Sequence, residues 1–389
     1  MAQQSTAHTA SLTRPGQANS AGDARALYLK LFSGEMFKGF QNNAIARDLV
    51  MKRTLKNGKS LQFIYTGHTK AEYHTPGNSI LGNSDGAPPV AEKTITCDDL
   101  LISSAFVYEL DETLAHYELR GEISKKIGYA LAEKYDRLIF RAITQGARKA
   151  SPITKANFIE PGGTQVRVGA AGTPAQSEAF NADNLIAAFY DAAAALDEKG
   201  ISTDGRVGVL NPRQYYELIQ KVGDGGLVNR DVQGGSLQSG KGVVEIAGIK
   251  IYKSMNIPFF DKYGIKYGIS GGPADPGNTG SFISQQIESA KTTDTGINNS
   301  YGQGLQQSDG TATGGDGNFK PSCGLIFQKE AAGVVEAIGP SVQVTSGDVS
   351  VIYQGDVILG RLAMGADYLN PAACVELYAG NATGNSAWS

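Results

Sequence analysis

One segment of the chain has the residue types and spacing of a phosphate-binding loop. Gly235-Ser-Leu-Gln-Ser-Gly240-Lys241 satisfies the first seven positions of the nucleotide-binding pattern, in which backbone N–H groups and a lysine hold phosphate oxygens. The eighth position, where a Ser or Thr hydroxyl would bind Mg²⁺, is Gly242. The run after it, Val243 to Ile246, is typical of a strand, whereas the pattern requires a helix. A nucleotide-binding α/β enzyme is therefore kept only as an alternative hypothesis.

Histidine, cysteine and acidic residues do not show the spacing of a metal or catalytic site. His68 and His74 lie close enough in sequence to share a site, but exposed polar positions account for them better. The acidic group of Asp98, Asp99, Glu109, Asp111 and Glu112 is more typical of helix capping and solvated charge than of Ca²⁺ binding. No ordered set of Ser, His and Asp stands out. We predict no catalytic, cofactor-binding or metal-binding residues.

Composition excludes several classes of protein. The 389 residues, 41% of them hydrophobic, suggest two or three domains with buried cores. A formal charge of −3 argues against a surface that holds nucleic acid tightly, because phosphate binding needs clustered Lys and Arg. No apolar run approaches the roughly 18 residues that span a bilayer. Three widely separated cysteines, Cys97, Cys323 and Cys374, favour reduced thiols in a cytoplasm over a disulfide framework.

Two strand-like runs enclose a stretch rich in turn-forming residues. Lys59 to Tyr65 and Lys93 to Cys97 alternate in character, which is typical of strands. The intervening stretch contains Gly67, Pro76, Gly77, Gly82, Gly86, Pro88 and Pro89. A two-stranded ribbon is marginal by itself in water. Its stability must therefore come from contact with something else, most simply another copy of the chain.

A long amphipathic helix follows this ribbon, and we predict it over 112–147. Apolar residues recur there every three or four positions: Leu119, Ile123, Ile127, Ala130, Leu131, Tyr135, Leu138 and Ala142. Acidic residues precede it and basic residues lie near its end, as the helix dipole favours. At about 1.5 Å per residue its length is roughly 50 Å, which is long for a compact enzyme domain.

The second half of the chain predicts a separate α/β region and then a β-rich region. Asn181 or Asp183 caps a helix that stops at Gly200, a strand follows at 206–210, and Asn211-Pro212 opens a second helix. Val243 to Lys253 predicts a strand pair or a bent strand. After a long loop at 271–320, which is either functional or poorly ordered, strands are predicted near 325–328, 334–338, 342–345, 349–354, 356–364 and 373–378.

Several motifs in this order resemble the major capsid protein of T-seven type short-tailed bacteriophages (podoviruses), and through it the HK-ninety-seven type fold of tailed-phage capsids. The first match is Gly58-Lys59-Ser60-Leu61-Gln62-Phe63, followed by Gly67 to Tyr73 and Pro76-Gly77. The second is Val357 to Gly365 with Pro371 beyond it. The long helix with His116-Tyr117 and the Asn211-Pro212 helix agree in order. The likeness covers roughly residues 23 to 379.

The resemblance implies an α+β fold with five parts. These are an N-terminal arm (1–56), an extended β-hairpin loop (57–96), a peripheral domain (97–179 and 336–371) with its spine helix (112–147), an α/β axial domain (180–335 and 372–379) carrying the 271–320 loop, and a tail (380–389). It also implies inter-subunit contacts through Lys59, Gln62, Phe63, Tyr65, Tyr73, Pro76 and Gly77 in the extended loop, and places Arg361 and Met364 on a peripheral-domain strand.

The function implied is that of a structural shell protein without enzymatic activity. Copies would form hexamers and pentamers of an icosahedral virion that encloses double-stranded DNA without sequence-specific binding, assembled in the host cytoplasm with a portal protein at one vertex. Only about 22 residues precede the first apolar pattern, so we expect a separate scaffolding protein. The nearest alternative is an encapsulin-type nanocompartment shell; the other is the nucleotide-binding enzyme.

Overall fold

The computed structural model describes ten stretches of the chain: residues 45–67, 73–77, 90–97, 100–108, 119–153, 160–169, 176–220, 245–257, 322–344 and 354–379. The chain divides into two compact units. Unit 1 contains residues 1–44, 98–134 and 337–364, and unit 2 contains 45–97, 135–336 and 365–389. Most of the predicted N-terminal arm (residues 1–44), the phosphate-loop-like segment, the 271–320 loop and the tail lie outside the described residues.

In unit 1, a helix packs on two antiparallel strands. β4 (Leu101–Tyr108) pairs with β11 (Gly355–Tyr368), and α4 (Leu119–Ala147) covers one face of the pair. Ile127 and Leu131 of the helix are buried there against β-strand side chains. Gly360 allows this close approach, since a Cβ at that position would collide with both helix residues. The observed helix lies within the predicted 112–147 and ends at the expected residue.

Four strands form the first sheet, in the order β1-β10-β11-β4. β1 (Met51–Thr54) runs parallel to the start of β10 (Ala332–Val344), with Met51 opposite Gly333. The short 3-10 helix η1 (Ala46–Asp48) precedes β1. The predicted break between 338 and 342 is wrong, because β10 is one continuous strand that carries Gly339 and Pro340 at exposed positions, where a missing backbone donor is tolerated.

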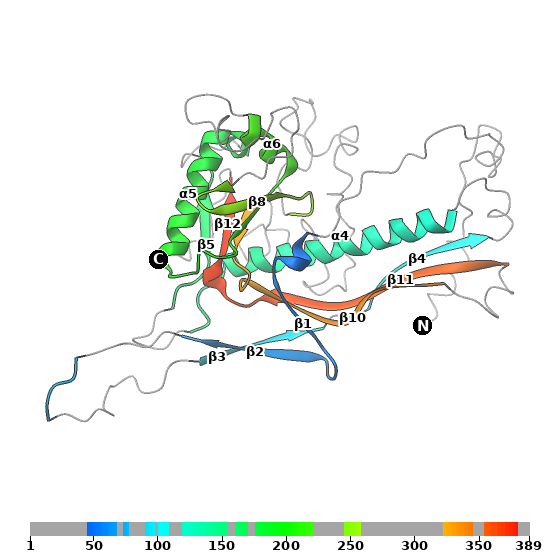
Figure 1. Ribbon diagram of the computed structural model, residues 1–389, viewed down its shortest axis with the longest axis horizontal. Coiled ribbons are helices and arrows are strands. Elements are labelled where there is room, and N and C mark those ends of the chain that lie inside the picture. Colours follow the sequence, from blue (N-terminus) through cyan, green and yellow to red (C-terminus); the bar gives the residue numbers. More distant parts are fainter. Residues whose placement is uncertain are drawn as a thin grey trace, which may run out of the picture. The chain divides into compact units, whose positions relative to one another are not determined.

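The second sheet lies in unit 2 and has the order β5-β12-β9-β6-β8-β7. Its strands are β5 (Thr164–Arg167), β6 (Val207–Leu210), β7 (Glu245–Ile246), β8 (Ile249–Lys253), β9 (Ser322–Phe327) and β12 (Cys374–Tyr378). The central strands β6 and β9 are buried along their whole length. Helices α5 (Ala182–Glu198) and α6 (Pro212–Gln220) share one core with it (Figure 1). The 3-10 helix η2 (Gln176–Phe180) precedes α5, and the 3-10 helix η6 (Pro371–Ala373) lies between β11 and β12.

Local signals in the sequence predicted the caps and turns of this sheet. Of the two candidate caps for α5, Asn181 is the one used, since its side chain accepts a hydrogen bond from the N–H of Asp183 at 3.0 Å. Asn211 caps α6 by accepting from the N–H of Arg213 at 3.1 Å. The Val243 to Lys253 region is a strand pair, because Ala247 and its neighbour Gly248 adopt positive φ in a tight turn.

Three strands were missed: β5, β4, and β1, which lies in the part of the chain predicted to be the N-terminal arm. β5 lies between the long helix and the α5 helix, where the sequence analysis predicted no strand, and it pairs parallel to β12. β4 lies in the segment before the long helix, where no strand was predicted. Four residues give too short a pattern for β5, which becomes a strand because β12 supplies its hydrogen-bonding partners.

Candidate assembly surface

The extended loop begins as a two-stranded antiparallel ribbon. β2 (Ser60–Thr66) pairs with β3 (Val90–Thr96) over seven residues, from Ser60 opposite Thr96 to Thr66 opposite Val90. The prediction of a ribbon is therefore confirmed. Of the segment between the strands, the structure describes Gly67, which is partly buried, and Tyr73 to Gly77, all five of which are exposed. Gly77 has a φ of 97°, a conformation that favours glycine.

One face of the ribbon is anchored in the chain's own core. Phe63 and Ile95 are buried together with Leu55 and Val335 in one cluster. The guanidinium of Arg53 lies over the ring of Phe63, 4.8 Å from its centroid. Phe63 thus fixes the base of the ribbon, and its side chain is only 8% exposed.

A charged contact holds the second strand of the ribbon. The Lys93 ammonium lies 2.9 Å from the Asp367 carboxylate and 3.8 Å from the centroid of the Tyr368 ring. Burial lowers the pKa of Lys93, but the carboxylate outweighs this and leaves the pKa raised. Gly365 lies against the end of the same strand, where a Cβ would overlap the carbonyl oxygen of Thr96. The ribbon is therefore attached to β11 by both charge and close backbone contact.

The other face of the ribbon is open. Four residues of β2 (Ser60, Gln62, Ile64, Thr66) and four of β3 (Val90, Glu92, Thr94, Thr96) are all exposed. Ile64 is 74% exposed and Val90 is 60% exposed. Exposed apolar side chains on one face of a ribbon mark an interaction surface when they lie together. We call this surface the outer ribbon face.

A buried carboxylate fastens the segment that leads into the ribbon. Glu336 accepts two hydrogen bonds from Arg47, both at 3.2 Å, and one from the Tyr135 hydroxyl at 2.8 Å, and lies 3.2 Å from Lys52. Burial raises the pKa of Glu336, but these donors outweigh burial and lower it overall. Burial, followed by the Glu336 hydrogen bond, raises the pKa of Tyr135. Glu336 thereby joins η1, β1 and α4 to β10.

Asp136, the residue after Tyr135 in α4, contributes a second carboxylate that holds the same segment. Asp136 is fully buried and accepts hydrogen bonds from the backbone N–H groups of Ile45 at 2.9 Å and Ala46 at 3.1 Å. The Asn256 amide approaches it at 3.4 Å. Burial raises the pKa of Asp136 to about 6, although these hydrogen bonds favour its charged form. Asp136 therefore caps η1 and fixes where the chain enters unit 2.

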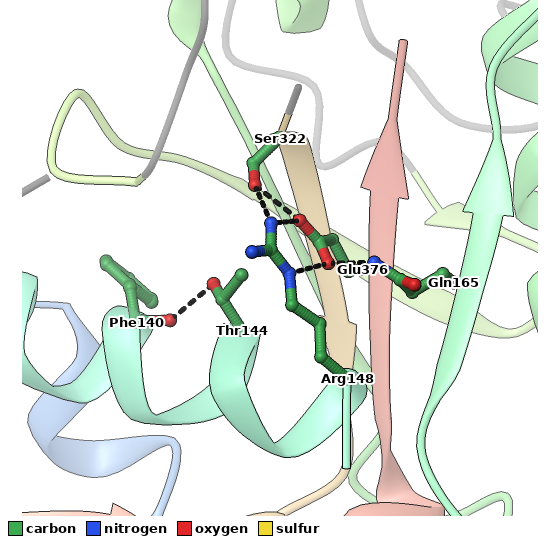
Figure 2. Close-up of polar contacts among 6 residues, drawn as sticks. All are labelled: Phe140, Thr144, Arg148, Gln165, Ser322 and Glu376. Carbon is green, nitrogen blue, oxygen red and sulfur yellow. Dashed lines mark hydrogen bonds and ion pairs between the residues drawn. The ribbon is translucent and has the colours of Figure 1, made fainter. Parts of the chain in front are cut away.

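The end of α4 is attached to the second sheet by a buried ion pair (Figure 2). Arg148 donates from Nε and Nη2 to Glu376 at 2.7 and 2.5 Å, and both side chains are almost fully buried. Ser322 and Gln165 also donate to the Glu376 carboxylate. One carboxylate on β12 thus gathers side chains from β5, β9 and the end of the helix, as Figure 2 shows.

The predicted contact residues fall into two groups. Lys59, Gln62, Tyr73, Pro76 and Gly77 are exposed, whereas Tyr65 is half-buried and Phe63 packs in the chain's own core as described above. On β11, Arg361 is half-buried and Met364 is 2% exposed. The sequence analysis did not name Ile64, Val90 and Glu92, which are exposed on the same face of the ribbon, although the alternation of β2 and β3 about buried Phe63 and Ile95 was a signal for this face.

Titratable and nucleophilic side chains do not form a further cluster in the described part of the chain. Within it, no group of three or more His, Cys, Asp or Glu side chains is placed to hold a metal ion. Cys323 and Cys374 are buried free thiols, and burial raises the pKa of both. Among the described helices, none combines the length and apolar character needed to cross a membrane.

Solved phage capsids share this fold. The chain matches the capsid structure of Cyanophage P-SCSP1u with a TM-score of 0.67 and 29% identity, over 94% of this chain and 98% of that one. It matches the mature capsid of bacteriophage PhiM1 with a TM-score of 0.60 and 15% identity, over 96% and 98% of the two chains. The second likeness concerns the fold alone. The α+β architecture is therefore that of a phage capsid protein.

Sequence comparison gives the family. A family model described as Gp10A-like major capsid protein matches residues 62–281, more than half of the chain. The chain belongs to this family of major capsid proteins, which confirms the resemblance to T-seven type capsids. It is 29% identical over 204 residues to the major capsid protein of Escherichia phage T7, a match that covers 51% of this chain and 58% of that relative. The matched region thus spans little more than half the length of this curated relative.

Family membership weighs against the earlier alternatives. A major capsid protein is a structural class and not an enzyme class. Neither the encapsulin-type shell nor the nucleotide-binding enzyme is favoured by these comparisons. The phosphate-loop-like segment lies outside the described residues, so its resemblance to a nucleotide site gains no structural support.

Proposed function

We propose that this chain is the repeating subunit of an icosahedral virion shell, in which copies join as hexamers and pentamers around double-stranded DNA. The observation that carries the proposal is the ribbon, with one face anchored through Phe63 and Ile95 and the other open. A two-stranded ribbon with an exposed apolar face gains stability from a neighbouring surface. Repetition by symmetry multiplies such modest contacts into a stable shell.

The contact residues divide by their environment. Exposed Lys59, Gln62, Tyr73, Pro76 and Gly77 meet a neighbouring copy. Phe63 and half-buried Tyr65 hold the base of the ribbon, and Met364 supports β11 from within. This division follows from burial, because a side chain that is already covered has little area left for a partner.

The charge of the chain agrees with enclosing DNA. A formal charge of −3 argues against a wall that holds the duplex tightly, so the genome can be packed without adhering to it. Assembly in the host cytoplasm, with a scaffolding protein during growth and a portal protein at one vertex, completes the proposal.

Electron microscopy of the purified chain, produced with and without its scaffolding partner, tests the proposal. Uniform icosahedral particles are expected, and their contents distinguish a genome from cargo enzymes. Monodisperse monomers or dimers under both conditions would contradict the shell and reopen the enzyme hypothesis. That hypothesis predicts ATP or GTP binding that the substitution Lys241→Ala abolishes.

A deletion tests the part of the extended loop that lies between the two ribbon strands. Replacing residues 67–89 by a short Gly-Ser turn keeps β2 and β3 but removes the rest of the extended loop. The subunit should remain folded by circular dichroism and lose assembly. Normal shells from this variant would contradict the assigned role of the loop. The matched control is Gly339→Ala, at an exposed glycine with no atom within 4 Å of an added Cβ.

A further inference from the structure

The inner face of the ribbon lies against residues of its own chain. It consists of three cross-strand pairs, at increasing distance from the base where the two strands begin and end: Leu61 with Ile95, Phe63 with Lys93, and Tyr65 with Ala91. Ile95 is 1% exposed and Phe63 is 8% exposed, whereas both members of the outermost pair are only partly buried. We call these six residues the inner ribbon face. Burial therefore decreases along this face from the base outward.

Apolar packing holds the first of these pairs. Leu61 and Ile95 pack with Leu55 and Val335 in the cluster described above. The hydrophobic effect favours burial but is non-directional. This cluster therefore keeps the base of the ribbon in place and leaves the angle of the ribbon to other contacts.

Lys93, in the second pair, makes contacts that have a direction. Its ammonium lies 2.9 Å from the Asp367 carboxylate and 3.8 Å from the centroid of the Tyr368 ring. Both partners are at the end of β11. The carboxylate attracts the ammonium to one point, and the negative face of the ring favours the same point. Lys93 is therefore held at a defined position on β11.

A second fixed point lies at the base of the same strand. Gly365 of β11 approaches the Thr96 carbonyl so closely that a Cβ at this glycine would overlap the oxygen. Thr96 and Lys93 are three residues apart on β3, which is roughly 10 Å along a strand. Two fixed points define a line, so β11 sets the direction of β3 and of the ribbon that β3 forms with β2.

We propose that Lys93 is a positioning residue, which sets the direction of the ribbon within the single subunit before any neighbouring copy is bound. The side chains of Lys93 and Asp367 are 29% and 32% exposed, so their ion pair adds little to the stability of the fold. Its effect is on assembly, because a ribbon already held in one direction loses less freedom when it meets a partner. This inference rests on the proposed shell function and names the residue that prepares the ribbon for it.

Spin labels measure the direction of the ribbon in the unassembled subunit. Ile64→Cys places one label on the outer ribbon face and Tyr190→Cys places the other on α5, both at exposed positions, in a chain that also carries Cys97→Ser. The same chain without the two added cysteines reports any labelling of the two buried native thiols. The distribution of distances between the labels, measured by pulsed electron paramagnetic resonance, should be narrow. Lys93→Met should broaden it.

Assembly and unfolding measurements separate positioning from folding. Lys93→Met should slow shell formation, followed by light scattering, by about tenfold, which corresponds to about 1.4 kcal/mol. Urea unfolding of the unassembled subunit should change little. Lys93→Arg should keep most of the assembly rate, because it keeps the cation. The matched control is Lys250→Met, the same change at an exposed lysine of β8, and it should alter neither measurement.

Charge exchange shows which copy supplies the partner of Lys93. Lys93→Asp and Asp367→Lys should each slow assembly when made singly. Both changes in one chain should restore the rate, because each copy again contains an ion pair of its own. A mixture of the two single variants should stay slow, since neither chain can form the pair internally.

Each other result overturns the inference in a recognisable way. An equally narrow distance distribution in Lys93→Met, a broad one before that substitution, or a normal assembly rate would show that Lys93 does not set the direction of the ribbon. A loss of unfolding free energy large enough to explain the slower assembly would reduce its role to folding. Recovery in the mixture of single variants would place the ion pair between copies. If the unsubstituted chain forms no particles, the shell function fails, and the spin-label measurement still decides the role of Lys93 in the subunit.

Discussion

Replacing Arg148 by methionine should cost far more stability than any surface substitution, because it leaves the Glu376 carboxylate buried without its cation. Glu376 is fully buried, and Arg148 supplies two of its hydrogen bonds, at 2.7 and 2.5 Å. Hydrogen bonds to charged groups contribute about 1.5–3 kcal/mol each. Breaking a buried pair by removing one partner costs about 3–5 kcal/mol. We therefore expect Arg148→Met to lower the free energy of unfolding by about 3–5 kcal/mol.

The assay is urea unfolding of the unassembled subunit, followed by far-ultraviolet circular dichroism. Glu376→Gln keeps acceptor capacity for Ser322 and Gln165 while removing the charge. In the double variant, which carries both Arg148→Met and Glu376→Gln, the methionine no longer faces a carboxylate. The double variant should therefore lose about 2 kcal/mol less unfolding free energy than the sum of the losses in the two single variants. Coupling of this size is the signature of a direct interaction.

A matched ion pair elsewhere in unit 2 supplies the control. Arg206 donates to Asp197 at 2.7 Å, a similar distance, but the Asp197 side chain is 60% exposed. Asp197→Asn should therefore cost less than about 1 kcal/mol. A cost for Arg148→Met no larger than that of this control, or single costs that simply add, would refute the reasoning that burial makes the Glu376 pair decisive.

Three further predictions concern the residues that hold the ribbon and its entry segment. The pKa of Asp136 is raised to about 6. The contribution of Asp136 to the free energy of unfolding is therefore full below the ordinary pKa of 3.8 and is lost as pH rises through 6. Unfolding measured from pH 4 to 7 should show this dependence on pH, and Asp136→Asn should flatten it. The pKa of Glu336 is lowered, so its contribution to the free energy of unfolding is present above the ordinary pKa of 4.5 and is lost as pH falls below that value. Glu336→Gln should remove this acid sensitivity, and an unchanged pH profile in that variant would contradict the assigned contacts. Gly365→Ala forces a Cβ into the Thr96 carbonyl and should destabilise the subunit by about 1–3 kcal/mol, whereas Gly339→Ala should be neutral in the same thermal unfolding assay.

The predictable parts of this fold are those governed by local signals. Asn181 and Asn211 cap their helices because short polar side chains satisfy the first N–H groups, and both caps could be read from sequence. The β2–β3 ribbon was predicted by alternation and by the turn-forming residues between its strands. β5 was not predicted, because four residues carry little pattern and their hydrogen-bond partners lie more than 200 positions away on β12.

The candidate site was predicted less completely than the fold. Lys59, Gln62 and Tyr73 were expected at a subunit contact, and they are exposed. Phe63 was assigned the same role, yet it is covered by residues of its own chain. Sequence alternation shows that two faces of a strand differ, but which face is buried depends on what packs against it.

The sequence by itself determined the class of this protein, because several weak motifs in a fixed order resemble those of a capsid family. Local physics determined the ribbon, the long helix and the caps, since helix periodicity, caps and turns act over a few residues. Tertiary structure alone decided which polar residues pair, as in buried Arg148 with Glu376 and half-buried Arg47 with Glu336. These partners are 228 and 289 positions apart, and only the folded chain brings such distant residues within hydrogen-bonding distance.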